Sequence, residues 1–139
     1  MGETGSRERS KPGGKRPRAG PSIKTVSLKC DLPSVREALS RLEQELTRAR
    51  QERIPIIKII HGYGSSGVGG DIRIAVQKRL YEMAEAGEIQ GCIFGENWAR
   101  SDDVAWRLLQ ARPELKEDAD LGRKNRGISI VWIGGSAGK

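Results

Sequence analysis

The stretch IPIIKIIHGYGSSGVGGDIRIAVQKRL, residues 54–80, decides the fold because it joins a short apolar run to a glycine-rich loop. Residues 56–60 are isoleucines apart from Lys58, which is typical of a central strand in a parallel sheet. Five glycines follow within nine residues, and glycine lets the backbone approach a ligand closely. These glycines are Gly62, Gly64, Gly67, Gly69 and Gly70.

An amphipathic helix is predicted to follow the loop, over residues 71–86, because apolar residues recur there at helical spacing. The first N–H groups of a helix and the positive end of its dipole attract anions. The strand, the loop and the helix start therefore predict a phosphate site, with a flexible strand–helix connection as the alternative. The predicted apolar face consists of Ile72, Val76, Leu80 and Met83.

The length of 139 residues allows one domain and a tail, with boundaries predicted at 1–22 (disordered and basic), 23–134 (α/β domain) and 135–139 (frayed). No run of 18 apolar residues and no N-terminal apolar segment is present, so we expect a cytoplasmic protein. One histidine and the two separate cysteines, Cys30 and Cys92, exclude a Cys/His zinc site. No cofactor is predicted.

The net charge of +7 favours polyanionic partners such as nucleic acid. Six basic and two acidic residues in positions 1–22 supply +4 of this charge, which leaves +3 for the rest of the chain. In the predicted domain, Arg73 lies near the glycine loop, and Arg123, Lys124 and Arg126 form a cluster before the last strand. Two acidic residues, Asp118 and Asp120, lie in the polar segment before this cluster. We interpret them as part of a solvated surface and not as metal ligands.

The other elements follow from local signals. Residues 25–30 alternate as a half-buried strand, and Ser34 with Glu37 forms a capping box that opens a helix to about residue 51. This strand–helix–strand unit predicts that its two strands are parallel. A third strand is expected at 89–94 and a last one at 128–133. Between them, Ser101 is the predicted N-cap of a short helix that ends before Pro113.

The motifs in this order resemble the Smr (small MutS-related) domain. The segment Ile59-Ile60-His61-Gly62-Tyr63-Gly64, with the later Gly67, Ile72-Arg73 and Val76, is similar to the family motif IIHGxGxG…LRxxV. The helix start at residues 34–39 resembles its TVEEAL, and residues 127–131 resemble its closing GATxV strand. The resemblance covers roughly residues 25–94 and 122–133.

The resemblance implies an α/β two-layer sandwich around a four-stranded mixed sheet, with βαβαββ order and an extra short helix between the last two strands. Some Smr domains are DNA-nicking or RNA endonucleases, and others bind structured nucleic acid. The family motif LDxHG, implicated in cleavage, corresponds here to residues 28–32, where Lys29 and Asp31 replace its Asp and His. The resemblance thus implies binding of RNA or branched DNA with cleavage weak or lost.

Three functions remain open at this point. The first is nucleic-acid binding through phosphate contacts. The second is an endonuclease in which His61 is the acid or base and Asp31 is a replacement carboxylate, with a divalent metal ion if required. The third is binding of a protein partner, with His61 in a structural role. The predicted nucleic-acid contacts are Lys58, His61, Gly62, Gly64, Gly67, Gly69, Gly70, Arg73, Arg123, Lys124 and Arg126.

Overall fold

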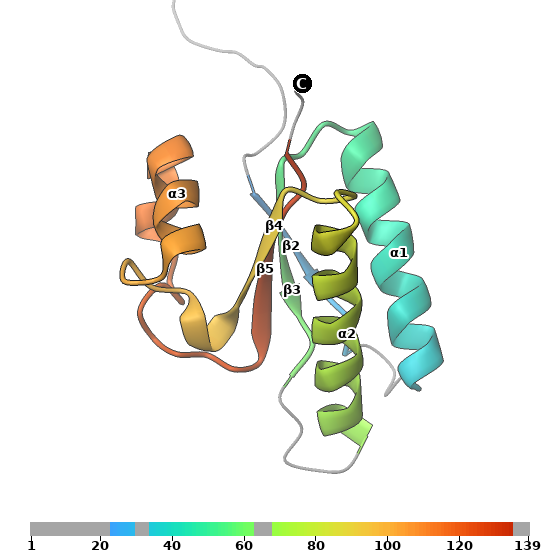
Figure 1. Cartoon of the computed structure of the whole chain (residues 1–139). Coiled ribbons are helices and arrows are strands. Elements are labelled where there is room, and N and C mark those ends of the chain that lie inside the picture. The colour runs from blue at the N-terminus through green and yellow to red at the C-terminus, as the bar shows by residue number, and fades with distance from the viewer. Residues whose placement is uncertain (1–22, 30–33, 63–67, 135–139) are drawn as a thin grey trace, which may run out of the picture.

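Four strands form one mixed sheet at the centre of the molecule (Figure 1). The computed structural model describes residues 23–29, 34–62 and 68–134. The strand order is β2-β3-β5-β4, so the last strand of the chain inserts between the second and the third. The strands are β2 (Ile23–Ser27), β3 (Ile56–Ile60), β4 (Gly91–Phe94) and β5 (Ile128–Trp132).

The pairing confirms the predicted mixed sheet. β2 and β3 are parallel, as the strand–helix–strand unit requires, with Val26 opposite Ile59. β5 runs antiparallel to both of its neighbours, β3 and β4. The two central strands, β3 and β5, are almost fully buried, which explains their continuous apolar sequence.

The first helix, α1 (Val35–Gln51), begins at the predicted capping box. The Ser34 side chain accepts a hydrogen bond from the Glu37 amide at 3.1 Å, and the Glu37 carboxylate accepts one from the Ser34 amide at 2.8 Å. These bonds satisfy two backbone donors that the helix itself leaves without partners. The residues that α1 buries share one face: Ala38, Leu42, Leu46 and Ala49.

The second helix, α2 (Val68–Glu85), begins three residues before the predicted start, so Gly69 and Gly70 belong to its first turn. Its predicted apolar face is confirmed, since all four residues from Ile72 to Met83 that define it are at most 5% exposed. The helix ends at Glu85, and in the turn that follows, Gly87 has a φ of +77°, a conformation that glycine adopts without strain.

The segment between β4 and β5 forms three short helices on the other face of the sheet (Figure 1). They are η2 (Gly95–Asn97), α3 (Asp103–Ala111) and η3 (Pro113–Glu117). The N-cap of α3 is Asp102, so the prediction of Ser101 is wrong. The Asp102 carboxylate accepts a hydrogen bond from the Ala105 amide at 3.0 Å. We did not predict η3, which begins at the proline that ends α3.

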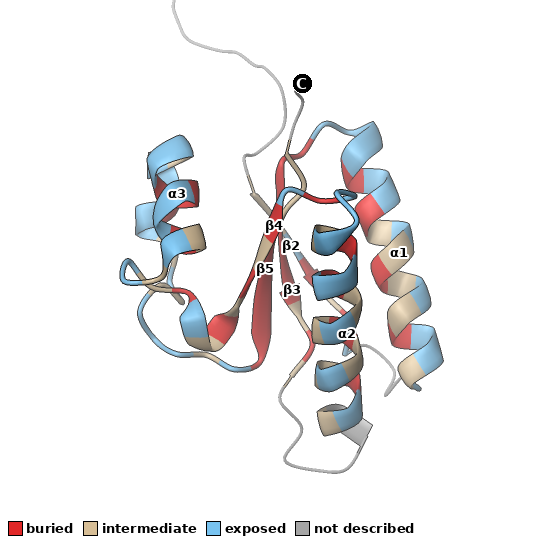
Figure 2. Cartoon of the chain, in the orientation of Figure 1, coloured by how far each residue is buried: buried red, intermediate tan, exposed pale blue. Residues whose placement is uncertain are grey.

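The sheet is therefore covered on both faces, and each face has its own apolar core (Figure 2). α1 and α2 pack on one face, which is the two-layer arrangement implied by the resemblance. The inserted helix adds a partial third layer, because Leu108, Leu109 and Leu115 need an apolar surface and the second face of the sheet offers one. No helix within the described ranges is both long and apolar enough to cross a membrane.

Candidate nucleic-acid interface

His61 lies directly after β3, where the strand leads into the glycine-rich loop. Its side chain is 2% exposed. Its Nδ1 is 2.6 Å from the carbonyl oxygen of Gly62, and its Nε2 is 2.9 Å from the hydroxyl of Ser129 in β5. The ring thus links the end of β3 to the neighbouring strand.

These contacts define the protonation of His61. A carbonyl oxygen only accepts, so Nδ1 carries a proton and donates it to Gly62. Nε2 is then the acceptor of the Ser129 hydroxyl proton. Burial lowers the pKa of His61 below its ordinary value of 6.5, and the positive charge of Arg73 acts in the same direction. His61 is therefore a neutral, fully hydrogen-bonded histidine at pH 7.

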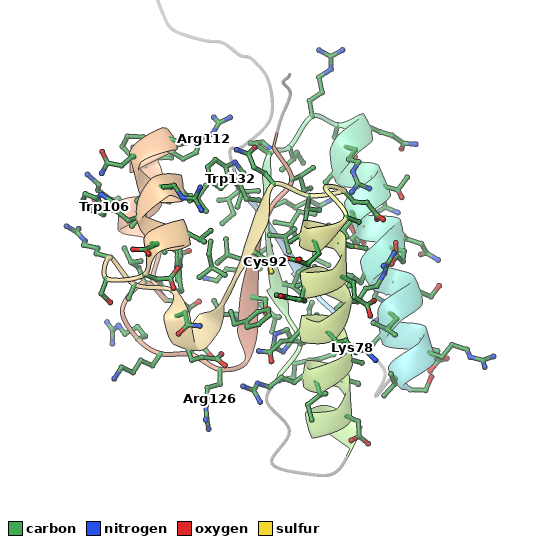
Figure 3. All side chains as sticks on the ribbon, in the orientation of Figure 1. Lys78, Cys92, Trp106, Arg112, Arg126 and Trp132 are labelled. Atoms are coloured by element: carbon green, nitrogen blue, oxygen red, sulfur yellow. The ribbon has the colours of Figure 1, made fainter. Side chains whose placement is uncertain are left out.

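The backbone around His61 holds a second loop against the end of β3. The amides of His61 and Gly62 both donate to the carbonyl oxygen of Gly127, at 2.9 and 3.0 Å. We call residues 122–127 the basic loop because Arg123, Lys124 and Arg126 lie in it. All three side chains are exposed, and Arg126 projects outward from the loop (Figure 3).

Lys29, which the predicted set of binding residues does not include, also lies at this site. Gly62 has a φ of +76°, and a Cβ placed on it would lie 3.5 Å from Cδ of Lys29. Lys29 follows the end of β2, as Gly62 follows the end of β3. The carboxyl ends of parallel strands lie at the same edge of a sheet, so the predicted parallel pair could have indicated this placement. Lys29 is exposed, and the glycine against which it lies is the one whose amide bonds to Gly127 of the basic loop.

Arg73 extends from α2 toward the same end of the sheet. Its Nη2 is 2.9 Å from Oε2 of Glu96 in η2. In addition to the effect of burial, the charge of Arg73 lowers the pKa of His61 and the charge of Glu96 raises it. Glu96 offsets part of the positive charge of Arg73. Glu96 carries no sequence signal for this contact, because it lies 23 residues away from Arg73 along the chain.

Lys58 is the predicted contact that the structure places elsewhere. Its side chain points to the α3 face of the sheet and is 8% exposed. Its ammonium group pairs with Asp118 at 3.1 Å and with Asp120. Burial works against the charge, but hydrogen bonds to Asp120 and Asp118 raise the pKa of Lys58 above its ordinary value. Lys58 is therefore removed from the set of phosphate contacts.

The two aspartates are likewise not a solvated face, because they belong to a hydrogen-bond network. Asp118 accepts from the indole Nε1 of Trp98 at 3.0 Å, and Asp120 accepts from the side-chain amide of Asn125 at 3.0 Å. The Asn125 side-chain oxygen accepts from the Gly127 amide at 2.9 Å. The network thus extends from Lys58 to the residue that bonds His61.

Several predicted residues lie outside the described ranges: Cys30, Asp31, Gly64 and Gly67. Gly69 and Gly70 are in the first turn of α2, next to the loop. Cys92 is a half-buried free thiol. Within the described part of the chain, no group of three or more acidic, histidine or cysteine side chains is arranged to hold a metal ion.

The described residues define an α/β domain with a mixed four-stranded sheet. At one end of the sheet a buried histidine is bonded to a loop that carries three exposed basic residues. No family model matches the chain, and no curated protein matches it. The structure is similar to the crystal structure of the Smr domain of Thermus thermophilus MutS2, with a TM-score of 0.49 and 19% sequence identity. The similarity covers 80% of this chain and 98% of that one. Smr is also the family that the sequence motifs resemble.

Proposed function

We propose that this protein binds nucleic acid through phosphate contacts at the end of the sheet where β3 meets the basic loop. The observation that carries the proposal is that an exposed lysine and a loop with three exposed basic residues meet the same glycine from separate parts of the chain. Lys29 lies against Gly62, and the Gly62 amide binds Gly127, which directly follows Arg126. Exposed lysines and arginines grouped in this way fit the backbone of a polyanion.

Gly62 and α2 add to the fit. Gly62 has no side chain, so the side chain of Lys29 can lie against its backbone at that point. The first N–H groups of α2 follow the glycine-rich loop in the sequence, and the helix dipole favours a negative charge at that end of the helix. Arg73, partly neutralised by Glu96, completes the basic surface from the side of α2.

In this proposal His61 supports the site and does not touch the ligand. The ring is buried, and both of its nitrogens already have partners in Gly62 and Ser129. Its contribution is to hold the turn that presents Gly62 and the basic loop. A proton-transfer role would require His61 to leave these partners, so the arrangement favours binding over cleavage.

The test measures the affinity of the full chain for labelled structured RNA and branched DNA at increasing salt. The variant Lys29→Gln/Arg126→Gln removes two charges from the proposed site. If both side chains contact phosphates, the slope of log affinity against log salt becomes less steep by up to about 2. Comparison of the two ligands then identifies the preferred nucleic acid.

The matched control is Arg107→Gln/Lys116→Gln, which removes the same charge from exposed positions on the inserted segment. We expect this control to retain the wild-type slope. Equal changes in both double variants would mean that only net charge matters, and the proposed site would be rejected. Complexes with a protein partner that survive high salt, without nucleic-acid binding, would favour the partner-binding hypothesis instead.

A further inference from the structure

The inserted segment between β4 and β5 contacts the proposed site through a continuous set of hydrogen bonds. Lys58 in β3 pairs with Asp118 and Asp120, which follow η3. Asp120 accepts from Asn125, and Asn125 accepts from the Gly127 amide. The Lys58–Asp118 pair joins residues 60 positions apart along the chain, whereas the Asp120–Asn125 and Asn125–Gly127 bonds are local.

The same segment is also held by close packing. Gly95, the first residue of η2, lies directly under the basic loop. A Cβ on Gly95 would lie 2.7 Å from the carbonyl oxygen of Ile128 and would also clash with the carbonyl oxygen of Asn125. The loop therefore has a defined position on η2, and no side chain larger than a hydrogen fits between them.

The basic loop contains the chemical reason for such support. Lys124 has a φ of +56°, and Gly122 has a φ of +81°, so the backbone of the loop bends through two left-handed positions. A non-glycine residue in this region has a conformational cost that the surrounding contacts must offset. The hydrogen bond from Asn125 in the loop to Asp120, just before the loop, supplies one such contact.

We infer that Lys58, through Asp118, Asp120 and Asn125, positions the basic loop against Gly62, so that these residues influence the strength of nucleic-acid binding. This inference rests on the proposed function. Lys58, Asp120 and Asn125 are positioning residues: they act through Arg126 and make no contact with the ligand. The inserted segment, which is additional to the motifs of the sequence, thus becomes part of the binding site.

The first test is a double-mutant cycle of Asn125→Ala with Arg126→Gln, with affinity for the preferred nucleic acid as the readout. Asn125→Ala removes two hydrogen bonds and no charge. We expect affinity to fall about two- to tenfold, as for the loss of one or two ordinary hydrogen bonds. Because Asn125 acts through Arg126, the effect of Arg126→Gln becomes smaller in the Asn125→Ala background than in the wild type.

A second variant tests the position of the loop without removing a polar group. Gly95→Ala pushes the loop away from η2, and Gly91→Ala is its control, since a Cβ there would lie 3.4 Å from Val104, an ordinary contact. We expect Gly95→Ala to weaken binding and to shift the amide resonances of Gly62 and Gly127. The control is expected to do neither. Binding is measured at a temperature well below the thermal unfolding midpoint of each variant, so that a loss of stability alone does not reduce the affinity.

The possible failures are distinct. If the wild type does not bind, or if Arg126→Gln has no effect, the proposed function fails and the inference fails with it. If the wild type binds through Arg126 but Asn125→Ala and Gly95→Ala leave the affinity and the effect of Arg126→Gln unchanged, the proposed function stands and the positioning role is overturned.

Discussion

The buried charges around Lys58 lead to a sharp prediction for stability. Lys58→Met keeps the length and much of the apolar volume of the side chain but removes its ammonium group. Asp118 and Asp120 then lose the cation that they share. Their side chains are only 13% and 25% exposed, so water compensates for only part of the loss.

The magnitude follows from this burial. Removal of one partner from a fully buried ion pair costs roughly 3–5 kcal/mol in unfolding free energy. Partial exposure of Asp118 and Asp120 reduces this figure, and we expect a loss of about 2–4 kcal/mol at pH 7. The triple variant Lys58→Met/Asp118→Asn/Asp120→Asn should recover most of the loss, because no buried charge then lacks a partner.

The loss should depend on pH. In the wild type, hydrogen bonds from Lys58 and Asn125 lower the pKa of Asp120 below its ordinary value of 3.8. The resulting stabilisation is present above that value and disappears as the pH falls through the lowered pKa. In Lys58→Met the two carboxylates repel each other. Protonation of one of them removes this repulsion and restores part of the unfolding free energy of the variant. The difference between variant and wild type should therefore shrink between pH 7 and pH 4.

The assay is urea unfolding at several pH values, followed by far-ultraviolet circular dichroism. Lys24→Met is the control, since Lys24 also faces two carboxylates, Glu45 and Glu52, but at 3.6 and 3.8 Å and in a more open position. Such a pair contributes less than about 1 kcal/mol. The reasoning is refuted if Lys58→Met costs no more than Lys24→Met, or if its cost is the same at pH 4 and pH 7.

Two further predictions concern His61 and the start of α1. The protein contains a single histidine, His61. In NMR spectra of the folded state its imidazole should titrate with a pKa below 6.5. Because the unfolded chain binds this proton more readily, the unfolding free energy should fall by up to about 1.4 kcal/mol per pH unit as the pH drops below 6.5. A pKa at or above 6.5 would contradict the buried, neutral assignment. Ser34→Ala should lower the unfolding free energy by about 1 kcal/mol through loss of the helix cap, measured by thermal unfolding. Ser40→Ala, at an exposed position within α1, should be neutral or slightly stabilising, and an equal loss in both would contradict the capping role.

The elements of the fold were predictable where their signals are local. The capping box at Ser34 and the apolar faces of α1 and α2 depend on residues three or four positions apart, which always come together in a helix. The parallel pairing of β2 and β3 follows from the handedness of a strand–helix–strand unit. The start of α2 and the N-cap at Asp102 were missed by one to three residues, because several neighbouring residues can cap a helix equally well.

The candidate site was predictable only in part. His61, Gly62 and the basic loop carry recognisable sequence signals, and the structure brings them together through the Gly127 carbonyl. The role of Lys58 depended on tertiary structure. A lysine within a strand can point to either face and toward any partner, and its actual partner, Asp118, is 60 positions away along the chain.

The sequence by itself thus determined the strands and α-helices of the described residues to within a few positions, but not the 3₁₀ helices η2 and η3, and it identified the loop that carries the basic residues. Only the tertiary structure decided that Ser129 bonds to His61, that Lys29 covers Gly62 and that the inserted segment holds the basic loop. The physical reason is range. Periodicity and capping arise from neighbours along the chain, whereas burial, ion pairing and hydrogen bonding between distant residues depend on how the layers of the fold pack against the sheet.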